Sequence, residues 1–294
     1  MRKILFDTDI GSDIDDAVCL AYLLAHPECE LLGITTVSGE ANLRAEMADA
    51  MCKNAGKNIP VFPGVEKPLL GNSKQPKAPQ AAALGGRPRE KNFKQNEAIN
   101  FMRDTIRANP GEVDLLAVGP MTNVGLLFAN DPEIPSLLNS LWLMCGVFKR
   151  RHGFVGLLEW NALNDPAATA ITYEARPKVH RSVGLDATCL CVMNAKEVRE
   201  RFSKCEILAP VSDFAEVWFR HSETLTFHDP LTAACLFNEN ICKFSRGKVD
   251  VELCGERLAG LTHWTDDANG PHEAALEVSP EAFFDEYFRV VENA

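Results

Sequence analysis

Several features that would define other protein classes are missing from this sequence. Its ten cysteines form no CxxC pair, which argues against a zinc ribbon or thioredoxin chemistry. Most of them lie in apolar runs, where a cysteine acts as a small buried hydrophobic residue in a reducing compartment. No run reaches the roughly 18 apolar residues of a membrane span. The amino-terminal residues lack the long apolar region of a secretory signal, so we expect a cytoplasmic protein.

The charge balance excludes two further classes of partner. The chain has 30 basic and 41 acidic residues and a net charge of −11 at pH 7. Such an excess of negative charge disfavours binding to a nucleic-acid backbone or to an anionic membrane. We therefore expect a small molecule as the main partner, and a divalent cation would offset part of the negative charge locally.

Apolar runs suited to buried strands alternate with helical patterns over the first 190 residues. The predicted strands are 3–6, 30–37, 60–62, 113–118, 140–145 and 179–185, and the helices between them are 15–25, 41–55, 96–108 and one that starts at 119–123. This alternation predicts an α/β fold with an open, mostly parallel sheet flanked by helices and a Rossmann-like core. The sequence contains no repeat and no clear linker, so we expect one domain over residues 1–294.

The remaining segments are more helical. We predict helices at 195–203, 211–224, 228–237 and 280–290, and strands at 249–253, 258–264 and 273–278. Residues 65–93 are rich in proline, glycine and asparagine and contain few periodic apolar residues. They predict a long loop near the active face, either a lid or a surface insertion.

Five aspartates crowd into positions 7–16, directly after the first predicted strand and before an apolar helix. Like charges at such short range repel one another and raise each other's pKa values. Asp7 and Asp9 are two residues apart and face the same side of the strand end, while Asp15 and Asp16 begin the next helix. Carboxylates that converge in this way favour a site for a hard cation such as Ca²⁺ or Mg²⁺.

Polar residues later in the chain could complete this site. Asp229 stands before a proline in an apolar setting and could add a carboxylate ligand, and the neighbouring His228 could serve as a proton donor. Glu159 and Asn161 flank Trp160 and are suited to bind hydroxyl groups.

Three functions are compatible with these residues. In the first, the aspartates hold a metal that activates water for attack on a sugar carbon. In the second, Asp7 is the nucleophile of a haloacid-dehalogenase-like phosphatase, although Gly11 stands where that class expects threonine or valine. In the third, the pocket belongs to a non-catalytic nucleoside- or ribose-binding protein, which would not need so many carboxylates.

The order of the motifs resembles the inosine–uridine-type nucleoside hydrolases, a family of calcium-dependent N-ribohydrolases. The opening stretch Asp7-Thr8-Asp9-Ile10-Gly11 followed by Asp15-Asp16-Ala17 is similar to that family's first motif, with a turn two residues longer. Further similar segments follow in order: Ile34–Val37, Val118–Asn123, Glu159–Asn161 with Asp165-Pro166, Val183–Asp186, and His228-Asp229-Pro230. The resemblance implies hydrolysis of a ribonucleoside, or a related N-riboside, to ribose and free base in nucleoside salvage.

The same resemblance implies a role for each matching residue. The calcium ligands would be Asp9, Asp16, Asp229 and the backbone carbonyl of Val118. Asp9 would also take a proton from the calcium-bound water, His228 would lie near the leaving base, and Asp7 would support the site from behind. Asp15, Glu159 and Asn161 would hold the ribose hydroxyls. The family tends to form homodimers or homotetramers.

The chain departs from the family at positions that contact the substrate. Glu40 stands where the family often has an asparagine that contacts ribose, and Asn42 follows two residues later, so we expect both among the substrate-binding residues. The loop at 70–92 lacks the histidine–glycine pattern that many members carry near the base. These departures leave the identity of the base open.

Overall fold

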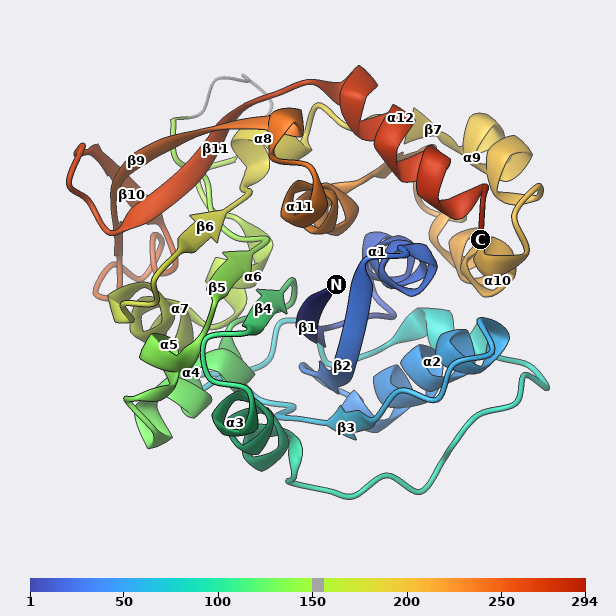
Figure 1. Ribbon diagram of the computed structural model, residues 1–294, viewed down its shortest axis with the longest axis horizontal. Helices are drawn as coiled ribbons and strands as arrows, with labels where there is room; N and C mark the ends of the chain where they lie inside the picture. Colours follow the sequence, from blue (N-terminus) through green and yellow to red (C-terminus); the bar gives the residue numbers. More distant parts are fainter. Residues whose placement is uncertain (150–155) are drawn as a thin grey trace.

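A nine-stranded sheet crosses the protein and carries helices on both faces (Figure 1). The computed structural model describes residues 1–149 and 156–294. The strand order is β10-β9-β11-β6-β5-β4-β1-β2-β3. The strands from β11 to β3 pair in parallel, whereas β9 is antiparallel to both of its neighbours. The predicted α/β fold with a mostly parallel sheet is confirmed, and this shared sheet supports the prediction of one domain.

The longest connection, residues 64–97, lies between the third strand and the third α-helix and contains one short 3₁₀ helix. The strands of the main sheet are β1 (Arg2–Thr8), β2 (Cys29–Thr36), β3 (Val61–Pro63), β4 (Val113–Ala117), β5 (Ser140–Leu143), β6 (His180–Ser182), β9 (Cys242–Val251), β10 (Thr262–Asp266) and β11 (His272–Val278). The α-helices are α1 (Asp15–Ala25), α2 (Ala41–Asn54), α3 (Ala98–Ala108), α4 (Thr122–Asn130), α5 (Ile134–Leu137), α6 (Trp160–Asn164), α7 (Pro166–Glu174), α8 (Leu185–Thr188), α9 (Ala195–Phe202), α10 (Ala209–Trp218), α11 (His228–Phe237) and α12 (Pro280–Val291). A second sheet pairs β7 (Val192–Asn194) with β8 (Thr224–Thr226), and short 3₁₀ helices lie at η1 (Pro79–Ala83), η2 (Glu206–Leu208) and η3 (Glu239–Ile241).

The central strand β1 contributes to a hydrophobic core on each face of the sheet. Ile4 and Phe6 belong to the larger core cluster, which includes α1, α11 and α12, while Leu5 belongs to the cluster under α3, α4 and α7. This alternation follows from the two-residue period of a strand. Within the described residues, none of the helices that cover these cores combines the length and the apolar character needed to cross a membrane.

Three of the predicted elements in the carboxyl-terminal third of the chain have wrong boundaries. The helix predicted at 211–224 ends at Trp218, because the chain then turns into β8. The strand predicted at 249–253 begins at Cys242, and the strand predicted at 258–264 spans Thr262–Asp266. β10 is an edge strand of the sheet and β9 lies beside it. On both strands charged side chains face solvent, so their apolar runs are short and conceal their length.

The direction of the chain reverses next to β1. The chain moves from β1 through β2 to β3 on one side, and from β4 through β5 to β6 on the other. Crossover connections that diverge in this way leave a crevice at the carboxyl ends of the two central strands, where α/β proteins bind ligands. The acidic residues after β1 and the turn after β4 therefore lie at the same place.

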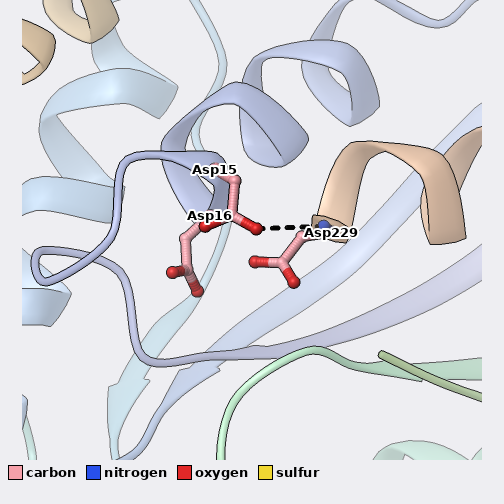
Figure 2. Close-up of side chains that lie close together, drawn as sticks. All are labelled: Asp15, Asp16 and Asp229. Carbon is pink, nitrogen blue, oxygen red and sulfur yellow. Dashed lines mark hydrogen bonds between the residues drawn. The ribbon is translucent and has the colours of Figure 1, made fainter. Parts of the chain in front are cut away.

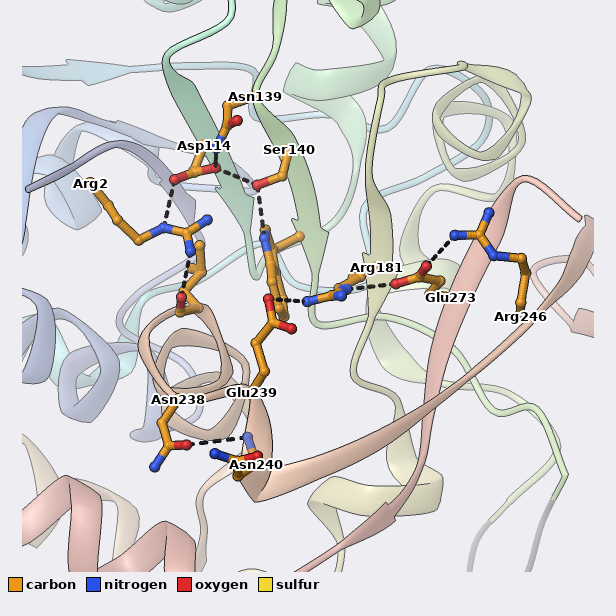
Figure 3. A network of polar contacts seen from close by, with 12 residues as sticks. Arg2, Asp114, Asn139, Ser140, Arg181, Asn238, Glu239, Asn240, Arg246 and Glu273 are labelled. Atoms are coloured by element: carbon orange, nitrogen blue, oxygen red, sulfur yellow. Dashed lines mark hydrogen bonds and ion pairs between the residues drawn. The ribbon is translucent and has the colours of Figure 1, made fainter.

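The opposite end of the sheet is held by a polar network (Figure 3). The Arg2 guanidinium contacts Asp114 of β4 at 2.8 Å and donates to the carbonyl of Leu236 at the end of α11. Arg181 of β6 pairs with Glu239 and Glu273, each at 2.7 Å, and lies over the ring of Trp142 at 5.0 Å. This network connects the strands to the carboxyl-terminal end of α11, whose other end carries Asp229.

We expect Arg181→Met to lower the free energy of unfolding by about 1–2 kcal/mol, because Glu239 and Glu273 lose a mostly buried partner while Glu273 keeps its pair with Arg246. The matched control is Arg199→Met, which breaks the exposed pair between Arg199 and Glu216. That variant should lose much less stability, since water screens exposed pairs. Urea denaturation measures both values, and equal losses would contradict the importance of the network.

Candidate active site

A cavity of about 650 Å³ opens at the carboxyl ends of the central strands. Most of the residues predicted for the site line it, and they come from four separate parts of the chain: Asp9, Asp15, Asp16, Val118, Glu159, Asn161, His228 and Asp229. The sheet topology therefore brings together residues more than 200 positions apart. Asp7, Glu40 and Asn42 are not among the residues that line the cavity.

Three buried carboxylates converge at one side of the cavity (Figure 2). Asp15 and Asp16 begin α1, and Asp229 lies in the first turn of α11. One carboxylate oxygen from each lies within 4.8 Å of the others. The backbone N–H of Asp229 donates to Asp15 Oδ2 at 3.1 Å, so the two helix starts are hydrogen-bonded directly.

The packing of α1 against α11 fixes this convergence. His26, at the end of α1, stacks on Phe237 at the end of α11 with ring centroids 3.6 Å apart. Tyr22 meets the same phenylalanine ring edge-on at 6.0 Å. Since both helices begin at the cavity, the positive ends of their dipoles point toward the carboxylates and stabilise them.

Burial and mutual repulsion disfavour negative charge on these three groups. Burial is the main cause that raises the pKa values of Asp15, Asp16 and Asp229 well above the usual range, and the neighbouring aspartates raise them further. Asp13 of the same turn also lines the cavity, and burial raises its pKa to about 7. A bound cation would reverse this effect. Because all the donors are hard oxygen atoms, the residues fit a divalent cation such as Ca²⁺ or Mg²⁺.

Asp9 lies beside this cluster, and its carboxylate has different neighbours. Gly119 approaches so closely that a Cβ atom there would lie 2.9 Å from Asp9 Oδ1. On the other side, the amide of Gln75 donates to Asp9 Oδ2. Burial raises the pKa of Asp9, and the positive charge of Arg44 partly opposes that shift.

Arg44 forms hydrogen bonds to three loops that border the cavity. This residue of α2 is fully buried, and its guanidinium donates to the carbonyls of Asp9, Ile10, Gly39 and Lys77 and to the hydroxyl of Ser12. These acceptors lie after β1, after β2 and in the long loop before η1. A single buried cation thereby fixes the backbone that carries Asp9.

Asp7 lies behind the cavity and is fully buried. Its Oδ1 accepts hydrogen bonds from Thr35 at 2.5 Å and Asn123 at 2.7 Å, whereas no partner is found for its Oδ2 among the described residues. Burial raises the pKa of Asp7 to about 7. A carboxylate in this position cannot reach a substrate in the cavity, which contradicts the hypothesis of a phosphatase with Asp7 as nucleophile.

Glu159 and Asn161 lie on another wall of the cavity. Glu159 caps α6 by accepting hydrogen bonds from the backbone N–H groups of Asn161 and Ala162, and it also accepts one from Gly146. The Asn161 amide donates to the carbonyl of Val118 at 2.6 Å. These bonds fix the orientation of both side chains in the cavity wall.

His228 is the residue before Asp229, and its ring belongs to the cavity wall. Its Nδ1 lies 2.7 Å from the hydroxyl of Thr188 in α8. Burial lowers the pKa of His228 to about 4, so the imidazole is neutral at pH 7. A neutral imidazole has one N–H to donate and one nitrogen to accept.

The structure places Glu40 and Asn42 away from the cavity. Glu40 has a left-handed backbone with φ of 62°, and its carboxylate accepts from the Lys77 ammonium and the Ala78 N–H. Asn42 accepts from exposed Gln95. Because these partners draw both side chains toward the long loop, the structure does not support the prediction that they contact substrate.

Sequence reasoning missed Arg44 and Gln75. Arg44 stands among the alanine and methionine residues that form the buried face of α2. Because arginine is rarely buried without partners, a lone arginine on such a face indicates a buried polar contact. Gln75 lies between a lysine and a proline in a segment without periodicity, so nothing local distinguishes it.

Comparisons with known proteins agree with this geometry. The Purine-Preferring Ribonucleoside Hydrolase from Gardnerella vaginalis has a similar structure, with a TM-score of 0.84 at 21% identity, over 99% of this chain and 98% of that one. The Inosine-Guanosine Nucleoside Hydrolase gives a TM-score of 0.85 at 22% identity, over 100% of this chain and 99% of that one. Both comparisons define the fold as that of the nucleoside hydrolases.

Sequence comparison identifies the family. The Inosine-uridine preferring nucleoside hydrolase model matches residues 4–285, so the chain belongs to this family. A relative from Oryza sativa subsp. japonica, Probable uridine nucleosidase 2, is 28% identical over 90% of this chain and 85% of its own length. The Pyrimidine-specific ribonucleoside hydrolase RihB of Escherichia coli O9:H4 is 29% identical over 64% of this chain and 60% of its own length. The protein is therefore an enzyme that hydrolyses the N-glycosidic bond of ribonucleosides, and the predicted resemblance is confirmed.

We expect Asp229→Asn to change how stability depends on pH and on divalent cations. The raised pKa means that folded Asp229 keeps its proton at pH values where the unfolded chain has lost it, above about 4. With chelator, wild-type stability should therefore fall as the pH rises from about 4, and the variant should lose less. With Ca²⁺ at about 100 times the Kd, the wild type should gain about 2.7 kcal/mol and the variant less than half of that.

Calorimetric Tm values over a pH series, with chelator and with Ca²⁺, measure both effects. Asp213→Asn, which changes an exposed carboxylate of α10, is the control and should respond as the wild type does. An Asp229→Asn protein with the full response to Ca²⁺ would exclude Asp229 from the cation site.

Proposed function

We propose that the enzyme is a calcium-dependent hydrolase that releases ribose and a free base, with Asp9 as the general base. The observation that carries this proposal is the meeting of two sets of groups in one cavity. Buried carboxylates from α1 and α11 converge in the cavity, and the polar side chains of Glu159 and Asn161 line it as well.

The proposed calcium ligands are the carboxylates of Asp9, Asp16 and Asp229 and the backbone carbonyl of Val118. Asp16 and Asp229 belong to the group of converging carboxylates, and Asp9 and Val118 line the same cavity. Calcium prefers six to eight oxygen donors in a flexible arrangement, which suits ligands from several loops. When bound, the ion would lower the pKa of water at the site and neutralise the carboxylates.

Asp15, Glu159 and Asn161 are the proposed ribose-binding residues. Cleavage of an N-glycosidic bond passes through a sugar with oxocarbenium character, and nearby carboxylates stabilise that positive charge. Asp15 is held by the Asp229 N–H, and Glu159 by three backbone N–H groups, so both are oriented before substrate arrives. Such pre-orientation avoids a reorganisation cost during the reaction.

Asp9 and His228 would act at the two ends of the reaction. Asp9 would accept a proton from water as the water oxygen bonds to C1′ of the ribose, and the C1′–N bond would break with its electron pair moving to the base. His228 would donate a hydrogen bond from its neutral imidazole, oriented by Thr188, to the departing base, which leaves as an anion and then takes a proton from solvent water. Asp7 would support this machinery from behind through Thr35 and Asn123.

Uridine and inosine are the substrates to test first. The family description includes both nucleosides, and relatives from plants are named as uridine nucleosidases. We further propose a homodimer or homotetramer and a cytoplasmic role in nucleoside salvage. All ten cysteines are free thiols, which suits a reducing compartment.

Replacing Asp9 with Ala should lower kcat by about 10³-fold or more, since a general base typically contributes roughly 10²–10⁴-fold and the ion would also lose a ligand. Steady-state kinetics on uridine and inosine measure this, and circular dichroism checks that the fold is retained. Asp213→Asn should keep wild-type kinetics. An Asp9→Ala enzyme with near-wild-type turnover would exclude Asp9 as the base.

Ribose release from a panel of ribosides should require Ca²⁺. We expect chelation to abolish the release of reducing sugar and added Ca²⁺ to restore it, because the carboxylates repel one another without the ion. Reducing-sugar assays on purine and pyrimidine nucleosides, with and without chelator, give the result. Calorimetric binding without product over hours would instead favour the non-catalytic binding protein.

A further inference from the structure

Residues 75–80 of the long loop are hydrogen-bonded to the turns that border the active site. The backbone N–H of Gly39 donates to the carbonyl of Gln75 at 3.2 Å, and Arg44 donates to the carbonyl of Lys77 at 2.9 Å. The N–H of Gln80 donates to the carbonyl of Gly11 at 3.1 Å. Residues 75–80 are thus a fixed wall of the cavity, joined to the turns after β1 and β2.

From this wall the side chain of Gln75 reaches into the site. It is 8% exposed, and both ends of its amide are bonded. Its Nε2 donates to Asp9 Oδ2, and its Oε1 accepts from the indole N–H of Trp160. Trp160 is the first residue of α6, lines the cavity and is 47% exposed.

Gln75 and Gly119 together restrict the orientation of the Asp9 carboxylate. The close approach of Gly119 limits one side of the carboxylate, and the Gln75 amide holds the other oxygen. A primary amide donates only from its nitrogen, so the bond from Trp160 to Oε1 also determines which end of the amide faces Asp9. If the amide were reversed, two acceptors would meet, and the bond would be lost.

We propose that Gln75 is a positioning residue that orients the Asp9 carboxylate for proton transfer, and that Trp160 keeps Gln75 in the required orientation. The inference rests on the proposed role of Asp9 as general base. It assigns to the long loop a part in the chemical step, in addition to its place in the cavity wall. Neither residue exchanges a proton with substrate in this role.

The test compares Gln75→Leu, Trp160→Phe and the double variant with wild type on a riboside that the wild type hydrolyses. Leucine keeps much of the volume of glutamine but has no amide, and phenylalanine keeps an aromatic ring but has no N–H. Gln80→Leu is the matched control, because Gln80 is a buried glutamine of the same wall that donates to the carbonyl of Ser12 instead of to Asp9.

We expect Gln75→Leu to lower kcat by about 10- to 100-fold, the range for one hydrogen bond to a charged group, with KM changed by less than about threefold. Trp160→Phe should lower kcat by about 3- to 10-fold. The double variant should be no slower than Gln75→Leu alone, because both substitutions break the same connection. Gln80→Leu should keep the wild-type kcat.

Four results would overturn the inference while leaving the proposed function intact. They are an unchanged kcat in Gln75→Leu, an increased kcat/KM in that variant, a rise in KM alone, and fully additive effects of the two substitutions. The second would make Gln75 a gate that blocks Asp9, and the third would make it a substrate contact. A wild-type enzyme that hydrolyses no riboside would instead refute the proposed function itself.

Discussion

Repulsion between buried carboxylates is the constraint on which this site depends. Asp15, Asp16 and Asp229 are all at most 3% exposed and approach one another within 4.8 Å. In a low-dielectric interior this arrangement is stable only with protons on some of the groups or with a cation among them. Among the described residues, Arg44 is the one arginine that is fully buried. It donates hydrogen bonds to backbone carbonyls and not to the carboxylates. Arg44 therefore leaves the charge of the cluster to be balanced by protons or by an added cation.

The fold maintains this crowding by holding α11 at both ends. At one end, Phe237 packs against the rings of α1, and the carbonyl of Leu236 accepts from Arg2 at the amino end of the sheet. At the other end, Asp229 bonds through its N–H to Asp15. A helix fixed in this way cannot move away to relieve the repulsion, so stability elsewhere in the structure maintains the binding site.

Much of the fold and half of the site could be predicted from local patterns. The strand and helix alternation up to β6 follows the apolar periodicity, and the aspartates from Asp7 to Asp16 lie at the first strand end as expected. The boundaries of β9 and β10 were predicted poorly, because solvent-facing charges interrupt their apolar runs. Glu40 does not line the cavity, because the partners that determine its direction, Lys77 and Ala78, belong to a loop without periodicity.

By itself, the sequence determined the parallel sheet and the acidic turn, since both depend on residues close together in the chain and on the periods of strands and helices. Only the tertiary structure decided which side chains meet. It brought Asp229 to the start of α1, placed Asp7 behind the cavity and set Gln75 between Asp9 and Trp160. These contacts depend on helix packing and on how one loop docks against two turns, and no local pattern encodes such distances.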